Sequence, residues 1–404
     1  MAYVTEMPWW RRIAIALVAT ALAATVASAA PRSGKKEETS RTSASHAMLL
    51  EADSGSVLFE RSADEPIYPA SLAKLMTAEY IFNEVKQGRV SLDREFYISE
   101  NAWRRGGAPS RTSSMFAPIH SKVRLEDLLR SIIIQSGNDA CIAVAEGIAG
   151  NERAFAEKLT RRAREIGLKQ STFTNATGLP DPNMQVTVRE LAKLARHIIH
   201  TYPQFYKIYS EREFTWNKIR QFNRNPLLKI DIGADGLKTG YTKDAGYGLV
   251  GSAVQQGLRL IVVVTGLKTA KERADEARKL LDWGFRSFRA RLLFAEGQNV
   301  GEAKVFGGDR GRVPLVGAGP IRVMVPRNSD EKILARIVYS GPVPAPVKKG
   351  QRIGQLKVWR DDKLALEVPL KAGADVGVGS LSQRAFDAAT ELVINLFRAG
   401  AERL

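Results

Sequence analysis

The chain has 404 residues, of which 44% are hydrophobic and 25% are charged. This is the composition of a globular protein, so it excludes a mainly disordered or collagen-like chain, and the length suggests about two or three domains. The lone cysteine, Cys141, excludes an internal disulfide framework and a multi-cysteine metal cage. The formal net charge of +17 favours anionic partners such as wall polymers, anionic lipids or nucleic acid.

The N-terminus has the parts of a secretory signal peptide. Two arginines precede an apolar run over residues 13–26, and Ala27-Ser28-Ala29 is a small-x-small cleavage site. The run is shorter than the ~20 residues that a membrane span needs, and an uncleaved anchor is the alternative. We therefore expect residues 1–29 to be a cleaved signal peptide. Export makes nucleic acid an unsuitable partner.

The next segments predict a sheet packed against helices. Residues 30–45 are polar and aperiodic and predict a flexible lead-in. Apolar runs on either side of Asp53-Ser54-Gly55-Ser56 predict a β-hairpin. Helical periodicity predicts helices at 71–86, 125–135, 139–148, 152–166, 188–201 and 269–286, and strand patterns occupy 214–216, 236–241, 247–254 and 258–265. This order of elements indicates an α+β fold.

The pattern changes near residue 291. Short alternating runs separated by Gly, Pro and Asp predict a small all-β domain, β-sandwich-like, over 291–380. In the tail, 381–404, Phe386, Val393 and Phe397 recur at helical spacing. We expect this amphipathic helix to lie in a membrane interface, and packing on the β domain is the alternative.

Ser71-Leu72-Ala73-Lys74 is the first of three short patterns that suit catalysis. Residues three apart share a helix face, so the Lys74 amine can reach the Ser71 hydroxyl. A serine hydroxyl is a poor nucleophile without a base, and a desolvated lysine can serve as one. The alternative is a helix cap beside a solvated lysine, but a charge within such an apolar helix would be costly.

Two further patterns follow in the chain. Ser136-Gly137-Asn138 interrupts two helical stretches, so it predicts a turn that faces a cleft, or a plain joint with an asparagine cap. Lys238-Thr239-Gly240 begins a strand-like run that continues into Tyr241-Thr242. Its glycine would let a substrate backbone lie along the strand edge, while Lys238 and the threonines face a carboxylate. A solvated edge strand is the alternative.

Taken together, these patterns resemble the Ser-x-x-Lys, Ser-x-Asn and Lys-Thr-Gly signature of the penicillin-recognising serine acyl-enzymes. The flanking residues 68–77, 135–141 and 235–240 are most similar to the low-molecular-mass D-alanyl-D-alanine carboxypeptidases, and the resemblance covers about residues 46–290. It implies a peptidase domain with an antiparallel sheet flanked by helices and an inserted helical cluster. It also implies peptidoglycan pentapeptide stems and β-lactam antibiotics as partners, and no cofactor or metal.

The resemblance also implies residue roles. Ser71 would be the acylated nucleophile and Lys74 its proton acceptor, with Ser136 relaying the proton and Asn138 holding Lys74 and the substrate amide. The backbone N–H groups of Ser71 and Tyr241 would form the oxyanion hole. The residues implied on the side of the terminal carboxylate are Arg224, Lys238, Thr239, Gly240, Tyr241 and Thr242.

Two residues depart from the family pattern. Three competing functions also remain open: that of a β-lactamase, that of a DD-endopeptidase and that of a non-enzymatic wall-binding protein. Gly137 replaces the aspartate of many β-lactamases, and the bulky Tyr241 would narrow the entrance. A β-lactamase of class A would carry Glu-x-x-Leu-Asn between Ser136 and Lys238, and this string is absent there.

The other candidate residues give weaker evidence of function. Cys141 is expected in the core, and His197 and His200 lack the further ligands that a metal needs. Arg273 is expected in a surface salt bridge, and a role in bracing the site from behind is the alternative. We expect an exported, periplasmic protein, peripheral on the outer face of the inner membrane.

Overall fold

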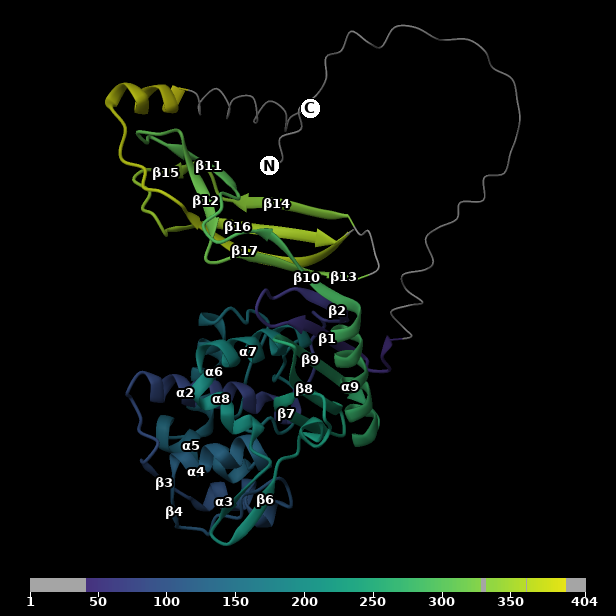
Figure 1. The fold of residues 1–404 in the computed structure, drawn as a ribbon. Helices are drawn as coiled ribbons and strands as arrows, with labels where there is room; N and C mark the ends of the chain where they lie inside the picture. The colour runs from purple at the N-terminus through teal and green to yellow at the C-terminus, as the bar shows by residue number, and fades with distance from the viewer. Residues whose placement is uncertain (1–40, 328–331, 361, 390–404) are drawn as a thin grey trace, which may run out of the picture.

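The structure, a computed structural model, describes residues 41–327, 332–360 and 362–389 (Figure 1). The predicted signal peptide and most of the predicted lead-in lie outside these residues. An antiparallel five-stranded sheet, in the order β2-β1-β9-β8-β7, organises the larger part. Its strands are β1 (His46–Glu51), β2 (Val57–Arg61), β7 (Ala234–Thr242), β8 (Gly246–Gln255) and β9 (Leu258–Leu267).

The central strand β9 is apolar without alternation because both of its faces are covered. Ile261 and Val263 join the core on one side of the sheet, and Leu260 and Val262 join the core on the other. The hairpin between β8 and β9 turns through two positive-φ residues at 256 and 257, a geometry that suits the twist of paired strands. The sheet is thus the middle layer of three.

Helices form the outer layers (Figure 1). On one side, α9 (Ala270–Ser287) buries Leu280 and Leu281 against the sheet, and Thr269 caps its first turn by accepting from Glu272 N at 3.0 Å. The other side carries η2 (Ala70–Ala73), α2 (Lys74–Lys86), α3 (Glu100–Gly106), α4 (Leu125–Arg130), η4 (Ser131–Gln135), α5 (Asn138–Ala149), α6 (Glu152–Glu165), α7 (Val188–Thr201) and α8 (Pro203–Tyr206). The α+β fold class is confirmed.

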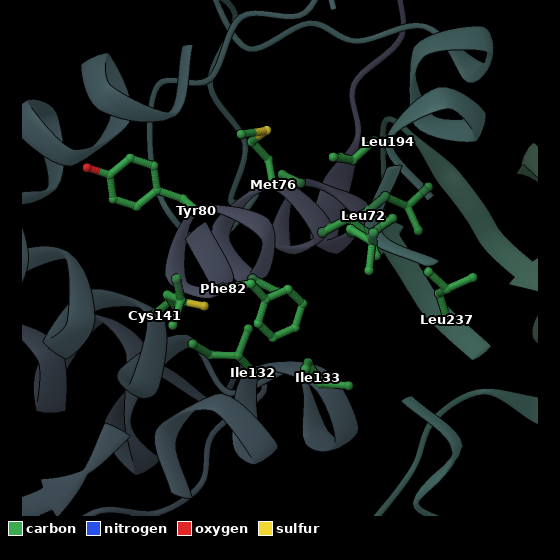
Figure 2. Close-up of a cluster of buried hydrophobic side chains, with 14 of the residues drawn as sticks. Leu72, Met76, Tyr80, Phe82, Ile132, Ile133, Cys141, Leu194 and Leu237 are labelled. Carbon is green, nitrogen blue, oxygen red and sulfur yellow. The ribbon is translucent and has the colours of Figure 1, made fainter. Parts of the chain in front are cut away.

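The apolar core of this second layer surrounds α2 (Figure 2). Leu72 reaches it from η2, Met76 and Phe82 from α2, and Cys141 from α5. Leu237 of β7 joins the same cluster, so the strand and α2 are fixed relative to each other through packed side chains.

Some predicted elements differ in detail. The helix expected over 71–86 begins as the 3₁₀ turn η2, and the helix expected over 125–135 ends as α-helix at Arg130 and continues as the π-helical turn η4. The two-stranded antiparallel sheet of β3 (Glu95–Tyr97) with β4 (Lys122–Arg124) was not predicted, because three-residue strands leave little periodicity. A hairpin pairs β5 (Glu213–Trp216) with β6 (Ile219–Phe222).

The C-terminal part is all-β, as predicted. A six-stranded sheet has the order β14-β16-β17-β12-β11-β15, and β10 pairs with β13 beside it over a shared core. The strands are β10 (Phe288–Phe294), β11 (Gly301–Phe306), β12 (Arg312–Gly317), β13 (Ile321–Pro326), β14 (Ile333–Tyr339), β15 (Val343–Pro344), β16 (Arg352–Arg360) and β17 (Lys363–Ala372). At the junction, Met324 N donates to Ser56 Oγ at 3.1 Å.

The described part of the tail, 381–389, is helical, and the rest of the predicted tail helix lies outside the described residues. Asp387 accepts a hydrogen bond from Gly307 N at 2.8 Å, which ties this helix to the β domain. Within the described ranges, the helices are all too short or too polar to cross a membrane.

Candidate active site

Ser71 and Lys74 meet where η2 passes into α2. Lys74 Nζ donates to Ser71 Oγ at 2.9 Å and to the carbonyl of Thr177 at 2.5 Å. The i+3 spacing predicted this approach, and the tight 3₁₀ turn brings the two side chains nearly into line. Neither residue acts as a side-chain cap, so the alternative role of Ser71 as a helix cap is wrong.

Burial changes the basicity of Lys74. Its side chain is 1% exposed, and the removal of water lowers its pKa from 10.5 to about 8, with the positive charge of Arg224 acting in the same direction. A lysine with a pKa near 8 is partly neutral at physiological pH. It can therefore accept the proton of a neighbouring hydroxyl.

The backbone beside Ser71 is held by a distant segment. Ala70 has φ 48, in the left-handed region that side chains disfavour. Gly178, with φ 78, lies against it so closely that a Cβ would stand 1.9 Å from the Ala70 carbonyl oxygen. Asn175 Oδ1 accepts from the backbone N–H groups of Thr177 at 3.0 Å and Gly178 at 2.8 Å, which fixes this segment. Such strain is typical of a functional site.

The second pattern forms the predicted turn. Ser136 has φ 68 and ends η4, and Asn138 is the first residue of α5 without capping it. A Cβ at Gly137 would stand 2.2 Å from Ser131 Oγ, so the packing of Ser131 favours glycine at this position. Ser136 Oγ and Asn138 Oδ1 are buried and have no hydrogen-bond partner among the described residues. Two buried polar atoms are therefore available to a ligand.

Asn138 and Lys74 share no hydrogen bond among the described residues. Its Nδ2 donates to Thr112 Oγ1 at 2.9 Å, on a loop anchored by Asp139. Asp139 accepts from Ser114 Oγ at 2.6 Å and Met115 N at 3.0 Å, and these bonds offset a burial that raises its pKa. Thr112 on this loop is therefore a hydrogen-bond partner of Asn138 that the sequence patterns did not indicate.

Lys238 and the following residues form the free edge of the sheet, because β7 is its outermost strand. Lys238 is buried, donates to Thr239 O at 3.1 Å, and has a pKa lowered by burial and by the charges of Lys74 and Arg224. Tyr241 is exposed and its ring lies 4.2 Å, centroid to centroid, from that of Tyr247.

A cleft of about 920 Å³ joins the three patterns. Of the predicted site residues, Ser71, Ser136, Asn138, Arg224, Thr239, Gly240, Tyr241 and Thr242 line it. The two lysines, Lys74 and Lys238, are buried behind this lining.

Arg224 lines the cleft from the loop between β6 and η6 (Pro226–Lys229), and Arg273 lines it from α9. Arg224 donates to Ser113 Oγ at 2.7 Å. Arg273 of α9 also lines the cleft, and the expectation of a surface salt bridge is wrong. Its guanidinium lies 5.6 Å from the ring of Tyr247, its buried Nε has no partner in the described part of the chain, and burial lowers its pKa. An arginine so placed is suited to an anionic ligand.

The remaining candidates have structural roles. Burial raises the pKa of the Cys141 thiol to about 12, which makes it inert. His197 Nε2 contacts Glu79 Oε1 at 3.1 Å rather than a metal-binding cluster. No group of three His, Cys, Asp or Glu side chains suited to a metal occurs within the described ranges.

Comparisons with known proteins match both parts of the chain. Residues 33–269 match the D-alanyl-D-alanine carboxypeptidase family, and residues 288–378 match the C-terminal domain of penicillin-binding protein 5. The carboxypeptidase DacA of Haemophilus influenzae is 38% identical over 87% of this chain and 89% of its own. DacC of Escherichia coli is 39% identical over 84% of this chain and 86% of its own.

Solved structures of penicillin-binding proteins also match this chain. Penicillin-binding protein 5 from Haemophilus influenzae has a TM-score of 0.71 at 38% identity, over 83% of this chain and 98% of that one. Penicillin-binding protein D2 from Listeria monocytogenes, in its ampicillin-bound form, has a TM-score of 0.55 at 29% identity, over 61% of this chain and 98% of that one.

These matches define a serine peptidase with the fold of the penicillin-binding proteins. The chain belongs to the D-alanyl-D-alanine carboxypeptidase family. The family, the fold class and the type of reaction predicted from the sequence are therefore confirmed.

Proposed function

We propose that Ser71 removes the terminal D-alanine from peptidoglycan pentapeptide stems through an acyl-enzyme. The observation that carries this proposal is the 2.9 Å contact between Lys74 Nζ and Ser71 Oγ, together with a lysine pKa near 8. At pH 7 roughly a tenth of such a lysine is neutral. That fraction suffices for a base that acts once in each turnover.

The reaction has two steps. Neutral Lys74 takes the Ser71 proton while Oγ bonds to the carbonyl carbon of the penultimate D-alanine, and the N–H groups of Ser71 and Tyr241 bind the oxyanion. The C–N bond then breaks as Lys74 returns the proton through Ser136 to the leaving nitrogen. A water hydrolyses the ester by the same route and restores Ser71.

Substrate binding uses the strand edge and the arginines. The stem peptide would lie antiparallel to β7, whose free edge offers backbone hydrogen bonds at Thr239 and Tyr241. Its terminal carboxylate would pair with Arg224 and Arg273, near the buried amine of Lys238. Asn138 Oδ1, which has no partner among the described residues, would accept from the substrate amide.

β-lactams would acylate the same serine, as the ampicillin- and cefotaxime-bound forms of the Listeria relative suggest. A synthetic pentapeptide and a fluorescent penicillin test the proposal together. Wild type should release free D-alanine and become labelled, Ser71→Ala should do neither, and the exposed Ser210→Ala should behave as wild type. Labelling of Ser71→Ala would overturn the assignment. Cleavage of cross-linked peptide dimers without release of D-alanine would indicate an endopeptidase. Rapid loss of the penicillin label from wild type would indicate a β-lactamase.

The site of action is proposed from the termini. Residues 1–29 would direct export and be removed, residues 46–290 would form the peptidase domain and 291–380 the β domain. The tail, 381–404, would hold the enzyme on the outer face of the inner membrane. Truncation after residue 380 should move the protein from the membrane fraction to the soluble fraction while the pentapeptide is still hydrolysed. An unchanged distribution would contradict a membrane role for the tail.

A further inference from the structure

Arg273 has an environment that is unfavourable for a cation. It lies in the first turn of α9, close to the positive end of the helix dipole. Burial lowers its pKa, and the nearby charge of Arg224 acts in the same direction. Within the described ranges no carboxylate forms a salt bridge with Arg273, and the described residues that line the cleft include no acidic one. A group other than a carboxylate therefore holds this guanidinium.

The ring of Tyr247 is the group that the structure places against it. The central carbon of the Arg273 guanidinium lies over this ring, 5.6 Å from its centroid, which is within the range of a cation–π contact. The face of an aromatic ring attracts a cation and leaves its N–H donors free, whereas a carboxylate would accept hydrogen bonds from them. Tyr247 can thus hold Arg273 while its donors stay available to a ligand.

Tyr247 is itself well fixed. Its backbone lies inside the sheet, because it pairs with Tyr241 of β7 on one side and with Leu267 of β9 on the other. Its ring packs on the ring of Tyr241, with the centroids 4.2 Å apart and the planes inclined by 31°. Tyr241 and Tyr247 both line the cleft. The ring of Tyr247 is therefore a fixed surface at the cleft on which Arg273 rests.

Arg224, a second arginine of the cleft, is held in a different way. It donates to Ser113 Oγ at 2.7 Å, so part of its hydrogen-bonding capacity is already in use. Because Arg224 and Arg273 carry like charges, their repulsion favours a guanidinium that turns away. An acidic partner would restrain Arg273 but would also compete with an anionic substrate for its donors. An aromatic ring restrains the arginine without this competition.

We propose that Tyr247 is a positioning residue, whose ring holds the Arg273 guanidinium where it binds the terminal carboxylate of the stem peptide. This role rests on the proposed function, since it concerns the carboxylate of that substrate. Tyr247 acts through Arg273 and not on the bond that is cleaved. Loss of its ring should therefore weaken the preference for a free C-terminal carboxylate more than it weakens hydrolysis itself.

The test compares a peptide ending in D-Ala-D-Ala with the same peptide carrying a C-terminal amide, and the readout is the ratio of their kcat/KM values. Tyr247→Leu and Tyr247→Met each remove the ring and should lower this ratio about three- to tenfold, as the loss of one cation–π contact allows. Tyr247→Phe keeps a ring face and should retain the wild-type ratio. The matched control is Tyr97→Leu, which removes an exposed ring stacked on His120 outside the lining of the cleft and should also retain it.

The double variant Tyr247→Leu with Arg273→Ala should have the same ratio as Arg273→Ala alone, because the two residues act as a unit. Labelling by fluorescent penicillin at saturating concentration would show that each variant retains a folded active site. A ratio that stays at the wild-type value when the ring is removed, including an equal loss of rate on both peptides, would overturn the positioning role alone. So would a loss in Tyr247→Phe as large as in Tyr247→Leu, a further loss in the double variant, or a wild-type ratio near one. Failure of wild type to hydrolyse either peptide would overturn the proposed function and the positioning role with it.

Discussion

Gly178 supports the backbone beside Ser71, the proposed nucleophile, because it lies directly against the carbonyl oxygen of Ala70, the residue before Ser71. A Cβ at position 178 would stand 1.9 Å from that oxygen. Ala70 itself has φ 48 and could not relax easily. The backbone conformation beside Ser71 thus depends on a segment that is far away in the chain.

Gly178→Ala is therefore expected to impair both stability and acylation. The left-handed φ and the steric clash together should lower the free energy of unfolding by about 2–4 kcal/mol. Gly150→Ala is the matched control, because Gly150 has φ 82 but nothing within 4 Å of the added Cβ. Urea denaturation and penicillin labelling check both variants, and equal effects would contradict a special role for the Gly178 contact.

Gly137 gives a second packing prediction. Gly137→Ala should reduce acylation severely, because its Cβ would stand 2.2 Å from Ser131 Oγ. That hydroxyl has no hydrogen-bond partner among the described residues, so its removal costs little.

The double variant Gly137→Ala with Ser131→Ala should recover part of the lost activity, since the clashing atom is gone. Ser131→Ala alone should acylate at nearly the wild-type rate. Rates of penicillin acylation check the set, and a double variant as inactive as Gly137→Ala would show that the clash is not the cause.

Arg273 should contribute to recognition of the terminal carboxylate. Arg273→Ala is expected to lower kcat/KM for the pentapeptide by about ten- to hundredfold, because a charge-assisted hydrogen bond is lost. A peptide with a C-terminal amide separates this role from a structural one. The variant should lose most of the discrimination between acid and amide that wild type shows. Discrimination as strong as in wild type would contradict the assignment.

The sequence alone predicted those features of the candidate site that depend on neighbouring residues. The spacing of Ser71 and Lys74 predicted their contact, and the glycine turn at 136–138 and the strand carrying Lys238 lie where expected. These features depend on helix periodicity, turn residues and strand pattern, which are encoded within a few neighbouring residues.

The sequence could not predict the contacts between distant segments of the chain. Thr112, which receives the hydrogen bond of Asn138, lies on a loop without periodicity. Thr177, whose carbonyl binds Lys74, contributes only its backbone, so no residue type marks it. Arg273 belongs to an amphipathic helix on which it is one of several arginines, and only the packing of α9 on the sheet brings it to the cleft.

The pH dependence of acylation tests the proposed role of Lys74 most directly. The base must be neutral, so its pKa of about 8 sets the fraction of competent enzyme. Arg224→Gln removes a nearby positive charge that lowers this pKa, so the variant should need a higher pH to reach its full rate.

The decisive measurement is the second-order rate constant for penicillin acylation of Ser71 by the wild-type enzyme between pH 6 and pH 10, followed by mass spectrometry of the intact protein. The constant should rise about tenfold for each pH unit below 8 and level off above it. A rate that is independent of pH over this range, or that falls as pH rises from 6 to 8, would contradict a neutral lysine as the base.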